Sequence, residues 1–258
     1  MIPFFVKTGT GAPLIILHGL FGSGDNWRTL ALRYAEAFTV YTVDMRNHGR
    51  SPHDDVHDYP SMAEDVRELM DAQGLETALV MGHSMGGKAA VQLACTHSER
   101  VRALVVSDMA LRAYGNNHED VLAALCETDL SLVVRREDAD AALSRRIADP
   151  GVRQFLLKSL YRDGDVFRWR FNLPVIVKNY GRIVAAVPEG GKPYFGPALW
   201  VRGEKSAYIQ DSDVAHIRQW FPNAEFAVAP GAGHWIHAEK PETYLEITRN
   251  FLSRFPVH

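Results

Sequence analysis

The sequence lacks several features that would define its class at once. Only two of its 258 residues are cysteines, Cys95 and Cys126, and their spacing matches neither a zinc site nor a redox pair. No apolar run is long enough to cross a bilayer, and the first residues do not follow the pattern of a secretory leader. We therefore expect both cysteines to be buried, reduced and inert, and we expect no membrane span and a cytoplasmic location.

An excess of charge of one sign is also missing. The chain has 31 acidic and 28 basic residues, a formal net charge of -3 and no polybasic stretch. This balance argues against nucleic acid as the main partner, and the composition carries no signal for an oligomeric state. Apolar residues make up 47% of the chain, which is ample for a core. A protein that acts on a small molecule is the default expectation.

Short apolar runs alternate with longer amphipathic segments. The runs span residues 14–17, 40–43, 78–81, 103–106, 198–201 and 226–228, and helical patterns cover 27–36, 62–73 and 88–97. This alternation predicts an α/β fold with a mostly parallel central sheet flanked by helices, and ligands at the carboxyl ends of the strands.

The alternation lapses between about residues 112 and 197, where the pattern is polar and helical. Helices are predicted over 121–126, 138–148 and 152–161, and a closing helix over 241–255. We interpret residues 112–196 as an inserted helical cap on a core domain formed by 1–111 and 197–258.

The stretch Gly82-His83-Ser84-Met85-Gly86 fits the pattern G-x-S-x-G between an apolar strand and a helical pattern. So sharp a turn forces its central residue into a left-handed conformation and leaves no room for Cβ atoms at the two glycines. The hydroxyl of Ser84 would then lie near free N–H groups at the start of a helix. We predict a nucleophilic serine rather than an ordinary turn with a capping serine.

A serine nucleophile needs a neighbouring base. His234 follows the predicted strand 226–228 in the loop "APGAGH" and is the candidate, whereas we expect His237, three residues on, to be structural. Neither histidine belongs to an HExxH pattern or has a cysteine partner, so we expect no metal and no cofactor.

Four blocks together resemble the α/β-hydrolase superfamily and, within it, the small YbfF-like esterases and their eukaryotic relatives. They are "LHGLFGSGDNW", "VDMRNHGRSPH", "GHSMGGKAA" and "GAGHWIHAEKP", in the family's order at both ends of the chain. The resemblance implies the α/β-hydrolase fold and a third catalytic group, an acid that orients the histidine.

The expected acid is where the chain departs from many members of the superfamily. The stretch "VRGEKSAYI" has Ser206 where an aspartate is usual, and a serine supplies no negative charge. Asp108 follows the preceding strand in "LVVSDMAL", where the YbfF-like group resembles this sequence. We predict Asp108 as the acid, although an aspartate at this place would also serve as a helix cap. Glu204 is the second candidate, and Asp211 or Asp213 are much weaker ones.

Ester hydrolysis also needs donors for the oxyanion, and the resemblance places them at the backbone N–H groups of Leu20 and Met85. We assign no proton transfer to His18. The candidate pocket residues are Phe21, His83, Trp169 and Trp235.

Two further stretches have competing interpretations. The loop 44–51, "DMRNHGRS", is expected to brace the oxyanion loop rather than to catalyse. The stretch 168–172 of the predicted cap mixes cations with aromatic residues. Its Arg168 and Arg170 would suit recognition of an anionic tail, as in a coenzyme A thioester, but a stretch of this composition is more often a solvated helix face.

The sequence thus predicts a serine hydrolase, a carboxylesterase or an acyl thioesterase, that cleaves small or acyl-chain esters through an acyl-enzyme on Ser84. A carbon-carbon bond hydrolase or a cofactor-free haloperoxidase would use the same triad, and a non-catalytic binding module would share the fold.

Overall fold

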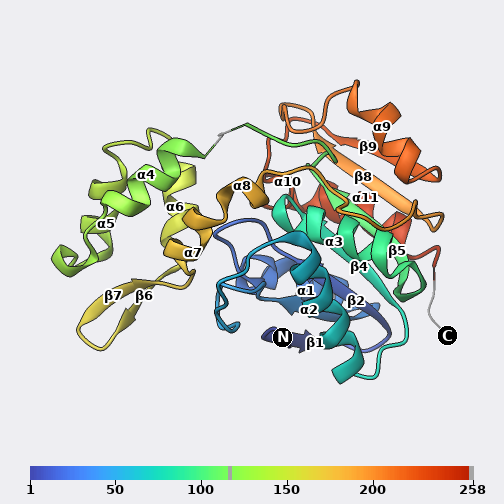
Figure 1. The fold of residues 1–258 in the computed structure, drawn as a ribbon, viewed down its shortest axis with the longest axis horizontal. Coiled ribbons are helices and arrows are strands. Elements are labelled where there is room, and N and C mark those ends of the chain that lie inside the picture. The colour runs from blue at the N-terminus through green and yellow to red at the C-terminus, as the bar shows by residue number, and fades with distance from the viewer. Residues whose placement is uncertain (116–117, 256–258) are drawn as a thin grey trace.

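The central sheet has seven strands among the residues described by this computed structural model, which are 1–115 and 118–255. Their order is β1-β3-β2-β4-β5-β8-β9, and every neighbouring pair is parallel except β1 with β3 (Figure 1). The strands are β1 (Phe5–Thr8), β2 (Ala12–Leu17), β3 (Phe38–Val43), β4 (Ala78–His83), β5 (Val101–Ser107), β8 (Ala198–Gly203) and β9 (Ala224–Ala229).

The mostly parallel sheet confirms the predicted fold class, but the sequence analysis missed β1. This edge strand reads Phe-Val-Lys-Thr and none of its residues is fully buried, so it has no apolar run to reveal it. The six strands that were predicted lie where the apolar runs placed them.

Alternate residues of β2 divide the core between the two faces of the sheet. Leu14 and Ile16 pack with α1 and α11, whereas Ile15 and Leu17 pack on the side of α2, α3 and α9. The helices of the core are α1 (Arg28–Tyr34), α2 (Tyr59–Ala72), α3 (Met85–Thr96), α9 (Asp213–Trp220), α10 (Ile236–Glu239) and α11 (Pro241–Leu252), with short 3-10 turns η1 (Gly24–Trp27) and η2 (Ser98–Arg100).

The segment between β5 and β8 lies beside the sheet (Figure 1). It is mainly helical but also contains an antiparallel hairpin. The helix predicted over 152–161 is present but ends at Leu157, because the hairpin begins at Leu160, and the helix face expected around Arg168 is a strand of that hairpin. The elements are α4 (Glu119–Glu127), η3 (Leu130–Leu132), α5 (Arg136–Leu143), α6 (Pro150–Leu157), β6 (Leu160–Asp163), β7 (Val166–Trp169), α7 (Leu173–Lys178) and α8 (Tyr180–Ile183).

The buried Lys88 joins both ends of this segment to α3. Its ammonium group donates to the carbonyl of Arg112, at 3.0 Å, and to that of Ala185. The two ends also bind each other, because the N–H of Tyr114 donates to the carbonyl of Val184 at 2.8 Å. The helix that follows Ser84 is therefore bonded to this segment near each of its ends.

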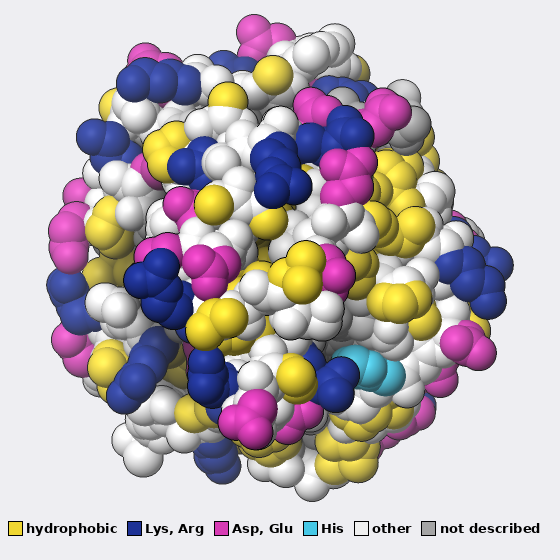
Figure 2. Space-filling model, turned by 90° about the vertical axis from the view of Figure 1, so that its left-hand side faces the viewer, with side chains coloured by type: hydrophobic (Ala, Val, Ile, Leu, Met, Phe, Trp, Pro, Cys, Tyr) yellow, Lys and Arg dark blue, Asp and Glu magenta, His cyan; other side chains and the backbone are white. Residues whose placement is uncertain are grey.

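The surface on the side of this segment mixes both signs of charge with apolar side chains (Figure 2). Arg168 pairs with Asp163 there and Arg146 pairs with Glu127, so neither sign dominates. Cys95 is buried, but Cys126 is exposed on α4, so the prediction of two buried cysteines is wrong for Cys126. Of the helices in the described residues, none combines the length and the apolar character needed to span a bilayer.

Candidate active site

Ser84 sits on the sharp bend between β4 and α3. Its φ of 54° is left-handed, as predicted for the centre of such a turn. A Cβ added to Gly82 would lie 2.1 Å from the carbonyl oxygen of Gly86, and one added to Gly86 would lie 2.4 Å from that of Leu17. Both glycines are therefore sterically required, and the bend places Ser84 at the amino end of α3.

His234 lies against Asp108. The Nδ1 atom of His234 and the Oδ2 atom of Asp108 are 2.7 Å apart, although 126 residues separate them in the chain. Asp108 is fully buried directly after β5, with a φ of 50°. Its Oδ1 accepts from the N–H of Gly203 at 3.1 Å, and its Oδ2 also accepts from the hydroxyl of Ser206. The carboxylate is thus held by β8, the strand next to its own.

The other candidate acids are engaged elsewhere. Glu204 is exposed and accepts from the N–H of Gly231 at 2.7 Å. Asp211 pairs with Arg202, and Asp213 with Arg112. Within the described residues Asp108 is the acid in contact with His234.

His234 is held through both its ring and its backbone. Tyr208 stacks on it with 3.9 Å between ring centroids, and the Nε2 of His83 donates to its carbonyl oxygen at 2.9 Å. His237 lies apart from Asp108, stacked on Trp27 at 4.2 Å. Burial lowers the pKa of His237 to about 3, so this buried ring is neutral near pH 7.

The loop after β2 is fixed by hydrogen bonds and carries a candidate oxyanion donor. The N–H of Phe21 donates to the Nε2 of His48 at 3.1 Å, and the Nδ1 of His48 donates to the carbonyl of Arg46 at 3.0 Å. These contacts confirm that the loop 44–51 braces the loop after β2. Among the described residues the N–H of Leu20 has no acceptor, and that of Met85 belongs to the first turn of α3.

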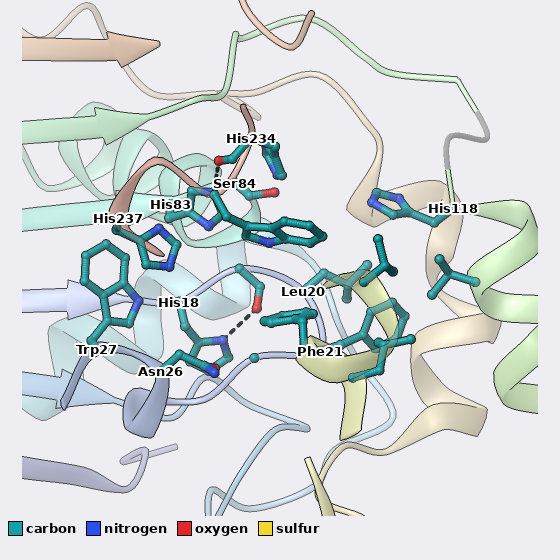
Figure 3. A pocket seen from close by; sticks show the side chains of 17 residues that line it. His18, Leu20, Phe21, Asn26, Trp27, His83, Ser84, His118, His234 and His237 are labelled. Atoms are coloured by element: carbon teal, nitrogen blue, oxygen red, sulfur yellow. Dashed lines mark hydrogen bonds between the residues drawn. The ribbon is translucent and has the colours of Figure 1, made fainter. Parts of the chain in front are cut away.

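An open cavity, with about 560 Å³ of empty space including solvent at its mouth, lies at Ser84 and His234 (Figure 3). Three of the predicted pocket residues, Phe21, His83 and Trp235, line it, whereas Trp169 does not. Trp169 instead lines a depression on the hairpin side of the segment 112–196. The other residues that line the cavity at Ser84 and His234 are His18, Gly19, Leu20, Gly22, Asn26, Trp27, His118, Val121, Val152, Phe155, Leu156 and His237. Within the part of the chain that the structure describes, no three His, Cys, Asp or Glu side chains are grouped to hold a metal ion.

A second cavity, with about 330 Å³ of empty space including solvent at its mouth, also reaches Ser84. Leu20, Ser84 and His118 line both cavities, so the two meet at the serine. The second cavity is walled mostly by apolar and aromatic side chains, which are Tyr59, Met85, Met109, Tyr114, Ile183, Val184 and Tyr208.

Sequence reasoning missed three residues of the site: Ser206, Tyr208 and His118. Ser206 was noted only as the place of an absent aspartate, yet its hydroxyl contacts Asp108. Its position in the loop after β8 was the signal that could have placed it there. Tyr208 lies in the stretch "VRGEKSAYI", which was considered only for its acids, and His118 comes from a part of the chain with no motif. Only the fold brings these two residues to Ser84 and His234.

We predict that Ser206→Ala lowers kcat about 10-fold, because a hydrogen bond to a charged carboxylate typically contributes 1.5–3 kcal/mol and here it helps to fix Asp108. Ser206→Thr keeps the hydroxyl and is the matched control, with kcat close to that of the parent. Steady-state kinetics on one short ester measures both. Equal kcat for the alanine and threonine variants would contradict a positioning role for this hydroxyl.

Comparisons with known proteins identify the family. The sequence profile described as "alpha/beta hydrolase fold" matches residues 12–241. The chain is 40% identical to Esterase YbfF of Escherichia coli, over 94% of this chain and 93% of that protein. It is 37% identical to the sn-1-specific diacylglycerol lipase ABHD11 of Mus musculus, over 93% and 80%. A solved structure titled "Marine microorganism esterase" superimposes with a TM-score of 0.95 at 42% identity, covering 97% and 99%. The chain therefore belongs to the alpha/beta hydrolase fold family and, within it, to the YbfF-like esterases.

Proposed function

We propose that this chain hydrolyses carboxylic esters through an acyl-enzyme on Ser84, with His234 as the base and Asp108 as the acid of the triad. The 2.7 Å contact between Asp108 and His234, at the cavity that Ser84 lines, is the observation that carries the proposal. A proton on Nδ1 donates to Asp108 and leaves Nε2 of His234 unprotonated, which is the form that accepts a proton from a serine.

The proposed reaction has two halves. Ser84 Oγ attacks the acyl carbon while His234 takes its proton, and the oxyanion receives the N–H groups of Leu20 and Met85. The bond to the alcohol then breaks, and His234 returns the proton to the departing oxygen. Water, deprotonated by His234, attacks the acyl-enzyme and releases the acid with Ser84 restored.

The two cavities give the ester an orientation. His234 lines the larger cavity and not the smaller one, and it must protonate the leaving alcohol. We therefore assign the alcohol part to the larger cavity and the acyl chain to the smaller, apolar one. We also propose that the segment 112–196 acts as a cap, since residues from it line both cavities.

An oxygen ester is favoured over a coenzyme A thioester. Arg168 pairs with Asp163 at 2.7 Å, and Arg170 lies over the ring of Tyr161 at 4.6 Å. Neither arginine lines the cavity at Ser84, so the anionic-tail interpretation has no support from their position. The relatives named esterase and diacylglycerol lipase support the same choice.

A fluorophosphonate probe tests this proposal directly. The folded protein is expected to take up about one probe per chain, on the peptide that contains Ser84, with loss of activity toward nitrophenyl butyrate. Ser84→Ala is expected to take up none. Mass spectrometry of the digested adduct gives the site. If the folded parent forms no adduct at Ser84, the proposed mechanism fails and a binding module on this fold becomes the better interpretation.

A further inference from the structure

His118 lies opposite the proposed triad and has no part in it. It immediately precedes α4, in the segment 112–196, and it lines both cavities at the point where they meet Ser84. Figure 3 places its ring across the larger cavity from Ser84 and His234. A polar side chain in this position faces any substrate that reaches the serine.

The contacts of His118 determine which ring nitrogen carries the proton. The hydroxyl of Tyr180 accepts from the backbone N–H of His118 at 3.2 Å and lies 2.9 Å from its Nδ1. No other partner of this hydroxyl is found among the described residues, and we therefore assign its proton to the bond with Nδ1. Burial lowers the pKa of His118 to about 4, and the ring is neutral near pH 7. Its single proton is therefore on Nε2.

The Nε2–H group of His118 is a donor without a protein partner. No described residue accepts a hydrogen bond from it. Among the described residues, the fully buried side-chain atoms without a partner are Nε2 of His57 and Nδ1 of His237, so Nε2 of His118 is not fully buried. The neighbouring cap residues on the cavity wall, Val121 and Phe155, offer no acceptor. An oriented donor on an apolar wall favours a ligand with one acceptor oxygen at that place.

We propose that His118 is a specificity residue whose Nε2–H donates to an acceptor oxygen, a hydroxyl or a second carbonyl, in the alcohol part of the ester. This inference rests on the proposed function, which assigns the alcohol part to the larger cavity. The preferred substrates are then short esters of polyols or of hydroxylated alcohols, rather than esters of simple alkanols. Tyr180 is the positioning residue, since it fixes the tautomer of His118.

Two esters of the same shape test the inference: 2-hydroxyethyl butyrate and propyl butyrate, which differ by a hydroxyl in place of a methyl. The readout is the ratio of their kcat/KM values, hydroxyethyl over propyl. His118→Phe is expected to lower this ratio about 10-fold, mainly through KM, because it removes the donor. His118→Gln keeps an N–H group at a similar place and is expected to restore most of the ratio. Tyr180→Phe frees the tautomer and is expected to lower the ratio about 3-fold.

His216→Phe, on the exposed face of α9, is the control and should leave the ratio unchanged. An unaltered ratio in His118→Phe would overturn the inference. So would a loss that is larger for propyl 3-hydroxybutyrate than for 2-hydroxyethyl butyrate, since it would move the contact to the acyl part. The proposed function fails separately, if the parent hydrolyses neither butyrate.

Discussion

Asp108→Asn is expected to lower kcat about 10⁴-fold with little change in KM, because the amide supplies no negative charge and its N–H₂ group favours the wrong tautomer of His234. The fold should survive the change. Asp108 has a φ of 50°, a conformation that asparagine tolerates better than most residues, and the asparagine oxygen can still accept from the N–H of Gly203. Steady-state kinetics on a short nitrophenyl ester, with circular dichroism as the check on folding, measures the effect.

The rival acids provide matched controls for this prediction. Glu204→Gln and Asp211→Asn are expected to stay within about 2-fold of the parent kcat, because surface substitutions away from the site have small effects. Glu204 binds the N–H of Gly231, and Asp211 pairs with Arg202 on the surface. A folded Asp108→Asn variant that keeps most of its turnover would remove Asp108 from the triad. A larger loss in Glu204→Gln would put that residue in its place.

The sequence predicted the parts of the site that follow from local sterics. Gly82 and Gly86 predict the bend because any Cβ at either place would collide with backbone, at Gly82 with the bend itself and at Gly86 with the end of β2. The spacing of the two glycines around Ser84 can be recognised in the sequence, although the second collision is with a distant segment. The positions of the buried strands along the chain likewise followed from their apolar runs, because each central strand is covered on both faces. The strand β1 escaped notice because it lies at the edge of the sheet, where burial does not dictate an apolar run.

Contacts between distant segments were not available from the sequence. Ser206 contacts Asp108 because β8 lies next to β5, an adjacency that reflects the strand order of the whole sheet. His118 reaches the cavity because of the path that the segment 112–196 takes. The sequence of this segment lacks the alternation of strand and helix that would predict such a path. Trp169 was predicted in the pocket from its residue type alone, and the hairpin turns it toward another surface.

The site is surrounded by neutral, buried histidines whose pKa values lie below the usual 6.5. Burial is the main cause in each of them. It lowers the pKa of His57 to about 4 and that of His237 to about 3, and it moves His48 and His83 well below their ordinary range and His18 in the same direction. In the unfolded chain the same side chains bind protons at about pH 6.5. Below that pH the unfolded state therefore holds more protons than the folded state, and acid favours unfolding.

The free energy of unfolding is accordingly expected to be highest above pH 6.5 and to fall steeply between about pH 6.5 and pH 4. Each such histidine contributes up to about 1.4 kcal/mol per pH unit below pH 6.5, so His57 and His237 together remove about 4 kcal/mol at pH 5. His18, His48 and His83 shift in the same direction and add to this loss, which is a large part of the stability of a domain. Urea unfolding followed by circular dichroism between about pH 8 and pH 5 measures this loss. His237→Phe keeps the stacking on Trp27 and deletes one titrating group, including a buried Nδ1 without a partner. Its loss between those limits should be smaller by about 2 kcal/mol, with equal or higher stability at pH 8. A parent stability that stays level down to pH 5 would mean that these rings take up protons without leaving the folded state.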